Sequence, residues 1–231
     1  MNLAQQELLH PALIKFIVFD IGGVLWEDSD PVLFEAIAKD LGLNFQDVQR
    51  AIDEIRDPST NASISEEESF EIMMKVMHIP KERRKDLERS FNHPKIFKPI
   101  RGMQDLIHNL TQNPKINIYL LSDIINISSL YKAVLKAIKK HYPWIKQDHI
   151  FISPRIKAAK REEGARAFEI LLEKLKITNS STVVFIDDIK KFVDIARERY
   201  QFQSIHFTHD SSQGRSSVDG LRSVFTKAGL L

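Results

Sequence analysis

Five short apolar runs, each long enough for a β-strand, alternate with helical patterns over most of this chain of 231 residues. The runs cover Ile14–Phe19, Ile116–Leu121, His149–Ser153, Val183–Asp187 and Ser204–Thr208. Between the later runs, apolar residues recur three and four positions apart, which is typical of helices with one buried face. Strands that alternate with helices predict parallel βαβ units, and therefore a doubly wound α/β sheet.

Residues 27–99 have a different pattern, with helical stripes and no convincing strand. The stripes cover Leu33–Leu41, Phe45–Ile55 and Phe70–Met77, and a capping-box pattern at Ser65–Glu68 precedes the third. We therefore predict an α/β core formed by residues 1–26 and 100–231, interrupted after its first strand by an all-helical domain of residues 27–99.

Several local features divide these elements further. Asp57–Asn61 has the composition of a loop inside the helical domain, and Pro80 is placed to open a fourth, charged helix. The Ser- and Gly-rich stretch Asp210–Ser217 is predicted to be mobile, and the apolar spacing that starts at Val218 indicates a final short helix.

The composition limits the class of protein. Charged residues make up 28% of the chain and the formal net charge is +2, which argues against a dedicated nucleic-acid binder. The absence of cysteine excludes disulfides and thiolate metal sites. Residues 1–10 lack the features of a signal peptide, and no apolar run approaches the roughly 20 residues of a membrane span. We expect a cytoplasmic monomer or homodimer with neither nucleic-acid nor membrane partners.

The first strand ends on Asp20, and Gly22 and Gly23 follow almost at once. Ligands of open parallel sheets bind beyond the carboxyl ends of the strands, so this carboxylate is in a position to act on one. It could cap the next turn, or it could attack phosphorus as a nucleophile. Two glycines would let the backbone approach a phosphate closely.

Two further strand ends carry groups that suit a phosphate. Ser122 ends the second strand, and its hydroxyl can donate a hydrogen bond to a phosphate oxygen. After the third strand, Lys157 and Lys160 are candidates for a lysine that neutralises phosphate charge and orients the nucleophile.

The fourth strand ends on two adjacent carboxylates, Asp187 and Asp188. Oxygen ligands from these acids and from Asp20, opposite them, would form a site that suits Mg²⁺. Without a cation, adjacent buried carboxylates would repel each other. The alternative is that one of the two only caps the helix that follows.

In chain order, Asp20, Ser122, Lys160 and the Asp187–Asp188 pair resemble the four active-site motifs of the haloacid dehalogenase-like (HAD-like) hydrolase superfamily. The form Asp-x-Gly-Gly-Val-Leu is similar to that of sugar-phosphatase-like members. The resemblance implies a Rossmann-like core, with residues 27–99 in the place of the helical cap that closes over the active site and selects substrates. It also implies a Mg²⁺-dependent phosphatase that acts through an aspartyl-phosphate on a small phosphorylated metabolite, with a sugar phosphate as a candidate.

The resemblance assigns a role to each matching position, with Asp20 as the nucleophile and Lys160 as the residue that orients it; the superfamily's lysine favours Lys160 over Lys157. The implied phosphate-binding residues are Ile21, Gly22, Ser122, Asp123 and Lys160. The implied metal ligands are Asp20, the backbone carbonyl of Gly22, Asp188 and, beside it, Asp187.

The sequence departs from the superfamily pattern at three positions. Most of these phosphatases carry a second aspartate two residues after the nucleophile, which protonates the leaving oxygen and then activates water; here that residue is Gly22. Arg161 replaces the proline that commonly follows the lysine, and Phe192 replaces an Asp or Asn that often lies four residues after the metal-binding acid. Losing a positioned acid/base typically costs about 10²–10⁴ in rate.

Three interpretations therefore stay open: a slow or specialised phosphatase, a phosphate- or phosphosugar-binding protein without turnover, and a metal-independent 2-haloacid dehalogenase. The Asp187–Asp188 pair and Gly22 argue against the dehalogenase. Glu27, near the start of the helical domain, is a weak candidate for a substitute acid. His206 and His209 lack a third ligand nearby in sequence, so we expect no metal at this pair.

Overall fold

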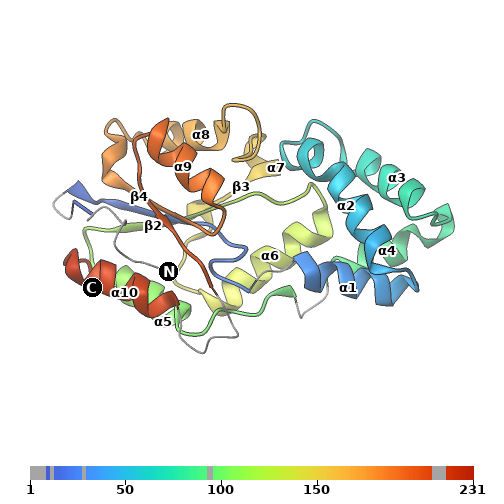
Figure 1. Cartoon of the computed structure of the whole chain (residues 1–231), viewed down its shortest axis with the longest axis horizontal. Helices are drawn as coiled ribbons and strands as arrows, with labels where there is room; N and C mark the ends of the chain where they lie inside the picture. The colour runs from blue at the N-terminus through green and yellow to red at the C-terminus, as the bar shows by residue number, and fades with distance from the viewer. Residues whose placement is uncertain (1–8, 11–12, 28–29, 93–95, 210–216) are drawn as a thin grey trace.

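The computed structural model describes residues 9–10, 13–27, 30–92, 96–209 and 217–231 (Figure 1). Its centre is a sheet of five parallel strands in the order β3-β2-β1-β4-β5. The strands are β1 (Phe16–Phe19), β2 (Asn117–Ser122), β3 (Ile150–Ile152), β4 (Val183–Asp187) and β5 (Gln203–His206). The predicted doubly wound parallel sheet is confirmed.

Successive side chains of the strands enter different cores, one on each face of the sheet. Ile17 and Phe19 of β1 belong to one apolar cluster, and Val18 between them belongs to the other. The first cluster is covered by α5 (Met103–Thr111), α6 (Ser128–His141) and α10 (Ser217–Lys227), and the second by α8 (Arg166–Lys174) and α9 (Lys190–Glu198) (Figure 1). Burial on both faces explains why the strands read as solid apolar runs.

In the described part of the chain, four α-helices follow one another between β1 and α5 and lie beyond one end of the sheet (Figure 1). They are α1 (Asp30–Leu41), α2 (Phe45–Thr60), α3 (Glu66–Val76) and α4 (Arg84–Ser90), and we call them the helical segment. The predicted capping box at Ser65 and Glu68 is present at the start of α3. The apolar residues of this segment are continuous with the cluster under the sheet. The domain boundaries after residues 26 and 99 stay a prediction.

The predicted loop at Asp57–Asn61 is wrong, because α2 continues through Pro58 and ends at Thr60. Proline removes one backbone donor and is costly inside a helix. Here it lies in the last turn, where packing holds the chain in helical form: Ser59 and Thr60 are buried, and the Thr60 hydroxyl donates to the carbonyl of Arg56.

Three hydrogen-bonded contacts join the helical segment to α6 and the loop before it. Ser59 accepts from the backbone N–H of Asn126 at 2.7 Å. The hydroxyl of Ser129 donates to the carbonyl of Glu88 at 3.0 Å. Glu66, in the first turn of α3, accepts from the backbone N–H of Ser128 at 2.8 Å and from its hydroxyl at 2.6 Å. The residue before α6 is Ile127, which offers no capping side chain, so Glu66 caps this helix from outside.

The predicted mobile stretch Asp210–Ser217 lies almost wholly outside the described residues, and α10 includes the predicted final helix. The charged helix expected after Pro80 forms as a 3-10 turn (Lys81–Arg83) followed by α4. In the described part of the chain, no helix is both long and apolar enough to cross a membrane.

Candidate active site

Parallel strands bring three predicted acids to one edge of the sheet. Asp20 follows β1, Asp187 ends the neighbouring strand β4, and Asp188 comes directly after it. Each of the three offers one oxygen, and these oxygens all lie within 4.8 Å of one another. Asp20 and Asp187 are buried. Ser122, at the end of β2 on the other side of β1, is buried at the same edge.

The side chain of Lys160 enters this acidic cluster. Its ammonium lies 2.9 Å from Oδ1 of Asp20 and 2.5 Å from Oδ2 of Asp187, and the residue is 1% exposed. Burial lowers the pKa of Lys160, but the carboxylates of Asp187, Asp20 and Asp123 outweigh burial and hold it above its usual range. Lys157 is exposed and lies at the end of the short helix α7 (Ser153–Ile156). Of the two candidate lysines, only Lys160 contacts the acids.

Asp123 fixes the backbone at Lys160, and so positions the Lys160 side chain. Its carboxylate accepts from the backbone N–H groups of Lys160 at 2.9 Å and Arg161 at 3.1 Å, and the Arg161 guanidinium lies 3.3 Å away. Burial raises the pKa of Asp123, and Lys160 and Arg161 oppose this effect. The predicted phosphate contact of this residue stays a prediction.

The adjacent acids Asp187 and Asp188 have different surroundings. Both oxygens of Asp187 are engaged: Oδ2 faces Lys160, and Oδ1 accepts from the N–H of Ile189 at 2.8 Å. Burial raises the pKa of Asp187, and the charge of Lys160 opposes the rise. Asp188 is only partly buried and lines the neighbouring cavity, and its carbonyl accepts from Nε2 of His206 at 2.9 Å.

Gly23 is required where it stands, and Gly22 is not sterically constrained. Gly23 has φ +69°, and a Cβ atom there would lie 2.3 Å from Oδ2 of Asp188. A Cβ atom on Gly22 would meet nothing within 4 Å. The second glycine therefore lets the Asp188 carboxylate approach the first loop, whereas the first leaves open space where most superfamily phosphatases carry an acid.

The donor set fits a divalent cation. The Lys160 ammonium contacts Asp20 and Asp187, and Asp188 lies within 4.8 Å of both. Buried carboxylates without enough positive charge are costly. Oδ1 of Asp20 is buried and has no hydrogen-bond partner among the described residues, since the Lys160 ammonium lies close but with poor hydrogen-bond geometry. Hard oxygen ligands around an unsatisfied carboxylate are what Mg²⁺ prefers. Of the three clustered acids, Asp20 and Asp188 line the cavity and would hold the ion.

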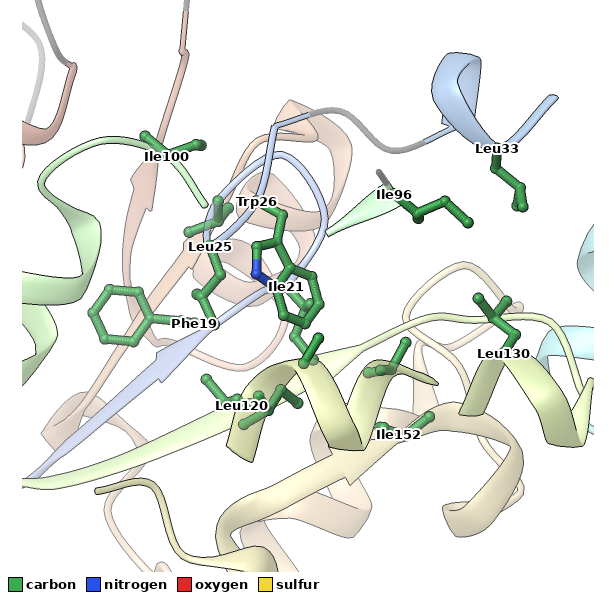
Figure 2. Close-up of a cluster of buried hydrophobic side chains, with 14 of the residues drawn as sticks. Phe19, Ile21, Leu25, Trp26, Leu33, Ile96, Ile100, Leu120, Leu130 and Ile152 are labelled. Carbon is green, nitrogen blue, oxygen red and sulfur yellow. The ribbon is translucent and has the colours of Figure 1, made fainter. Parts of the chain in front are cut away.

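A cavity of about 160 Å³ opens above these residues. We call Asp20, Ser122, Asp123, Lys160 and Asp188 its floor. Ile21, Gly22 and Gly23 line it beside Asp20. Its sides are mainly apolar, and we call the following residues the apolar wall: Trp26, Leu33, Ile52, Ile96, Phe97 and Leu130. Figure 2 shows Leu33, Ile96 and Leu130 gathered on one side of Trp26.

Glu27, Phe192 and His206, which the sequence also singles out, have structural partners. Glu27 forms an ion pair with Lys98 at 2.8 Å and is not among the described residues that line the cavity. The ring of Phe192 lies 5.1 Å from the Lys160 ammonium, a cation–π contact in place of an outer metal ligand. His206 contacts the Asp188 carbonyl. His209 belongs to no potential metal cluster within the described ranges.

Sequence reasoning missed two features of the site. One is the structural role of Asp123, which follows a strand-end serine and carries no pattern that points 37 residues ahead to Lys160. The other is Arg56, which enters the cavity lining from α2 and pairs with Asp30 at 2.8 Å. The helical spacing of α2 could have placed Arg56 on the same face as Ile52. It could not have shown that this face lies over the strand ends.

Solved structures share this fold. The chain is similar to a HAD family enzyme from Bacteroides thetaiotaomicron in its magnesium complex, with a TM-score of 0.66 and 22% identity over 90% of this chain and 98% of that chain. The complex of the same enzyme with magnesium and inorganic phosphate gives a TM-score of 0.64 and 24% identity, over 87% and 100%. A predicted HAD-like family hydrolase from Porphyromonas gingivalis gives 0.59 and 17%, over 92% and 98%.

A structure described as a dehalogenase is also similar, with a TM-score of 0.59 and 13% identity over 87% of each chain. No protein-family model and no curated protein matches the sequence. The chain therefore has the fold of HAD family enzymes, as its motifs predict. The similar structures include both a phosphate-bound enzyme and a dehalogenase.

Proposed function

We propose that this protein is a Mg²⁺-dependent phosphohydrolase of the HAD-like type that acts on a small phosphorylated metabolite. The observation that carries the proposal is the meeting of three carboxylates within 4.8 Å around the buried Lys160, at the floor of a cavity. The magnesium- and phosphate-bound state of the similar Bacteroides enzyme supports it.

Each floor residue has a part in the proposed reaction. Asp20 is the nucleophile, and Lys160, held by Asp187 and Asp123, stabilises charge on the transferring phosphoryl group. Ser122 and the backbone of Ile21 and Gly22 bind phosphoryl oxygens. Asp20, Asp188 and the Gly22 carbonyl would hold the ion, which would supply Lewis-acid stabilisation of the phosphoryl charge.

We assign Asp187 chiefly to Lys160 rather than to the metal. Both of its oxygens already have donors, and it is fully buried behind the cavity. The ammonium lies beside Oδ1 of Asp20 but leaves this oxygen without a hydrogen bond, so the carboxylate can still bind a cation. The ion pair therefore orients the nucleophile and does not bar cation binding.

Gly22 leaves the proposed enzyme without the usual acid/base, and Glu27 is paired elsewhere. This favours a slow or specialised phosphatase. Two alternatives have distinct signatures. A binding protein that has lost turnover would retain phosphate without hydrolysis. A metal-independent 2-haloacid dehalogenase would release halide in the presence of a chelator; the excess of carboxylates over cations at the floor disfavours it.

The test compares wild-type protein with Asp20→Asn. Phosphate release from phenyl phosphate and from several sugar phosphates is measured with Mg²⁺ and with EDTA, and halide release from 2-chloropropionate is measured in parallel. We expect Mg²⁺-dependent phosphate release from wild type and a loss of at least about 10³-fold in Asp20→Asn. Equal release from both proteins would exclude Asp20 as the nucleophile.

A further inference from the structure

We infer that the substrate is a phosphate monoester of a compact aromatic alcohol, a phenol-type leaving group, and not a sugar phosphate. This inference rests on the proposed function and specifies its substrate class. Two independent features carry it: the apolar wall of the cavity, and the open space at Gly22 in place of an acid.

The apolar wall favours substrates with an apolar group next to the phosphate. Above the floor, most described lining residues are aliphatic or aromatic, from α1, α2, α6, the loop after β1 and the segment that precedes α5. Trp26 and Phe97 meet edge to face at 5.0 Å between ring centroids. Such a surface binds an aromatic ring through burial and ring contacts. An apolar protein cavity of about 150 Å³ holds one benzene molecule. The 160 Å³ cavity must also hold the phosphate at its floor, so it leaves room for a single ring at most and not for a nucleoside.

The few polar groups above the floor already have partners. Arg56 lies 2.8 Å from Asp30 and 3.2 Å from Asp53. Arg161 faces Asp123 and, at 3.6 Å, Asp57. A hexose would bury several hydroxyls against this wall, and each hydroxyl without a partner costs free energy.

One buried donor of the wall, the indole N–H of Trp26, has no acceptor among the described residues. Figure 2 shows this nitrogen on the side of the ring away from Leu33, Ile96 and Leu130. The wall therefore presents ring carbons of Trp26 to a ligand, and this donor does not serve the hydroxyls of a sugar.

The absence of an acid at Gly22 favours substrates whose leaving group needs no proton donor. In the first step an oxygen of Asp20 bonds to phosphorus while the bond from phosphorus to the aryl oxygen breaks, and the electron pair leaves with the phenolate. The phenolate takes its proton from solvent, and water then attacks phosphorus to release inorganic phosphate and the Asp20 carboxylate. A phenol has a pKa of about 10, so it leaves as an anion far more easily than an alkyl alcohol, which needs a proton donor.

The first experiment separates polarity from leaving-group ability with three substrates. Phenyl phosphate has an apolar ring and a good leaving group, benzyl phosphate has a similar ring and a poor one, and glucose 6-phosphate is polar with a poor one. We expect kcat/KM for phenyl phosphate to exceed that for glucose 6-phosphate by at least about 100-fold, with benzyl phosphate between them. Hydrolysis of glucose 6-phosphate as fast as that of phenyl phosphate would overturn the inference and leave the phosphatase proposal standing.

A second experiment tests the wall by binding, without turnover. Leu33 and Leu41 both lie buried on α1, but only Leu33 lines the cavity. Leu33→Ala should weaken binding of phenylphosphonate about tenfold by calorimetry and leave that of inorganic phosphate unchanged. Leu41→Ala removes the same atoms from the same helix and should change neither affinity. Equal effects of the two substitutions on phenylphosphonate would overturn the inference.

The two proposals can fail separately. If wild type hydrolyses none of the three esters but binds phenylphosphonate through Leu33, turnover is excluded and the ligand class is supported. If Asp20-dependent hydrolysis favours glucose 6-phosphate, the proposed function is supported and the aromatic class is wrong. If neither hydrolysis nor phenylphosphonate binding is detected, both proposals are wrong.

Discussion

The floor and the apolar wall of the cavity are built in opposite ways. The floor comes from the ends of β1, β2 and β4 and from the loop that carries Lys160, and it contains three carboxylates and one buried ammonium. The wall comes from the helical segment, from α6, from the loop after β1 and from the segment that precedes α5, and its six members are uncharged. The sheet fixes the floor, because strand register alone decides where Asp20 and Asp187 meet.

This difference separates the chemistry from the choice of substrate. Charged residues on rigid strands are held in place by ion pairs and by backbone hydrogen bonds such as those of Asp123. The wall depends on packing between helices, which can change without disturbing the floor. We therefore expect floor substitutions to alter stability and metal response, and wall substitutions to alter ligand preference.

The largest effect on the floor should come from Lys160→Met, which keeps the length of the side chain and removes its charge. Asp20 and Asp187 would lose their shared buried counterion, at a cost of about 3–5 kcal/mol in the free energy of unfolding. The measurement is urea unfolding. Lys157→Met, on the same loop but exposed, should stay within about 0.5 kcal/mol of wild type. Similar losses in both variants would show that Lys160 does not stabilise the floor.

Gly23→Ala should have the next largest effect. The new methyl group would meet Asp188 at 2.3 Å while the backbone keeps a positive φ, and we expect a loss of about 3 kcal/mol. Gly42→Ala is the matched control: its φ is +67° and nothing lies within 4 Å of the added atom, so it reports the backbone strain alone, about 1 kcal/mol.

Both glycine variants are also compared for the rise in Tm on addition of Mg²⁺. A displaced Asp188 should reduce this rise in Gly23→Ala, whereas Gly42→Ala should keep it. An unchanged rise in Gly23→Ala would mean that Asp188 is not a ligand of the ion.

Gly22→Asp tests whether the floor lacks only an acid. The position has room for a side chain, and we expect hydrolysis of benzyl phosphate to rise about tenfold, because its leaving group needs a proton. Gly22→Asn has nearly the same shape without the acid and should give no rise. A rise in both variants, or in neither, would contradict the interpretation of Gly22 as the missing acid/base.

The sequence predicts more of the residues of the floor than of the wall. Apolar runs that end on Asp20, Ser122 and Asp187 place these residues at one sheet edge, since parallel strands share their direction. The different roles of Asp187 and Asp188 could not be predicted from the sequence. They depend on which of the two carboxylates the Lys160 ammonium contacts.

The helical segment shows where sequence reasoning stops. Apolar spacing predicted three of its helices, but the continuation of α2 through Pro58 depends on burial of Ser59 and Thr60 against other elements. No local pattern indicates that Ser59 accepts a hydrogen bond from Asn126, 67 positions further along the chain. Tertiary contacts of this kind determine which residues form the wall and where the wall lies over the floor.

The smallest effect should come from the contact that joins the helical segment to α6. Glu66→Gln removes the negative charge from the N-terminus of α6 and weakens its hydrogen bonds to Ser128, so we expect a loss of about 0.5–1 kcal/mol in the free energy of unfolding. Glu67→Gln is the control in the same turn of α3, because its ion pair with Arg84 is exposed and contributes little. A larger loss in Glu67→Gln would contradict the capping role of Glu66. If Glu66→Gln also weakens binding of phenylphosphonate but not of inorganic phosphate, then the position of the wall, and not that of the floor, depends on this contact.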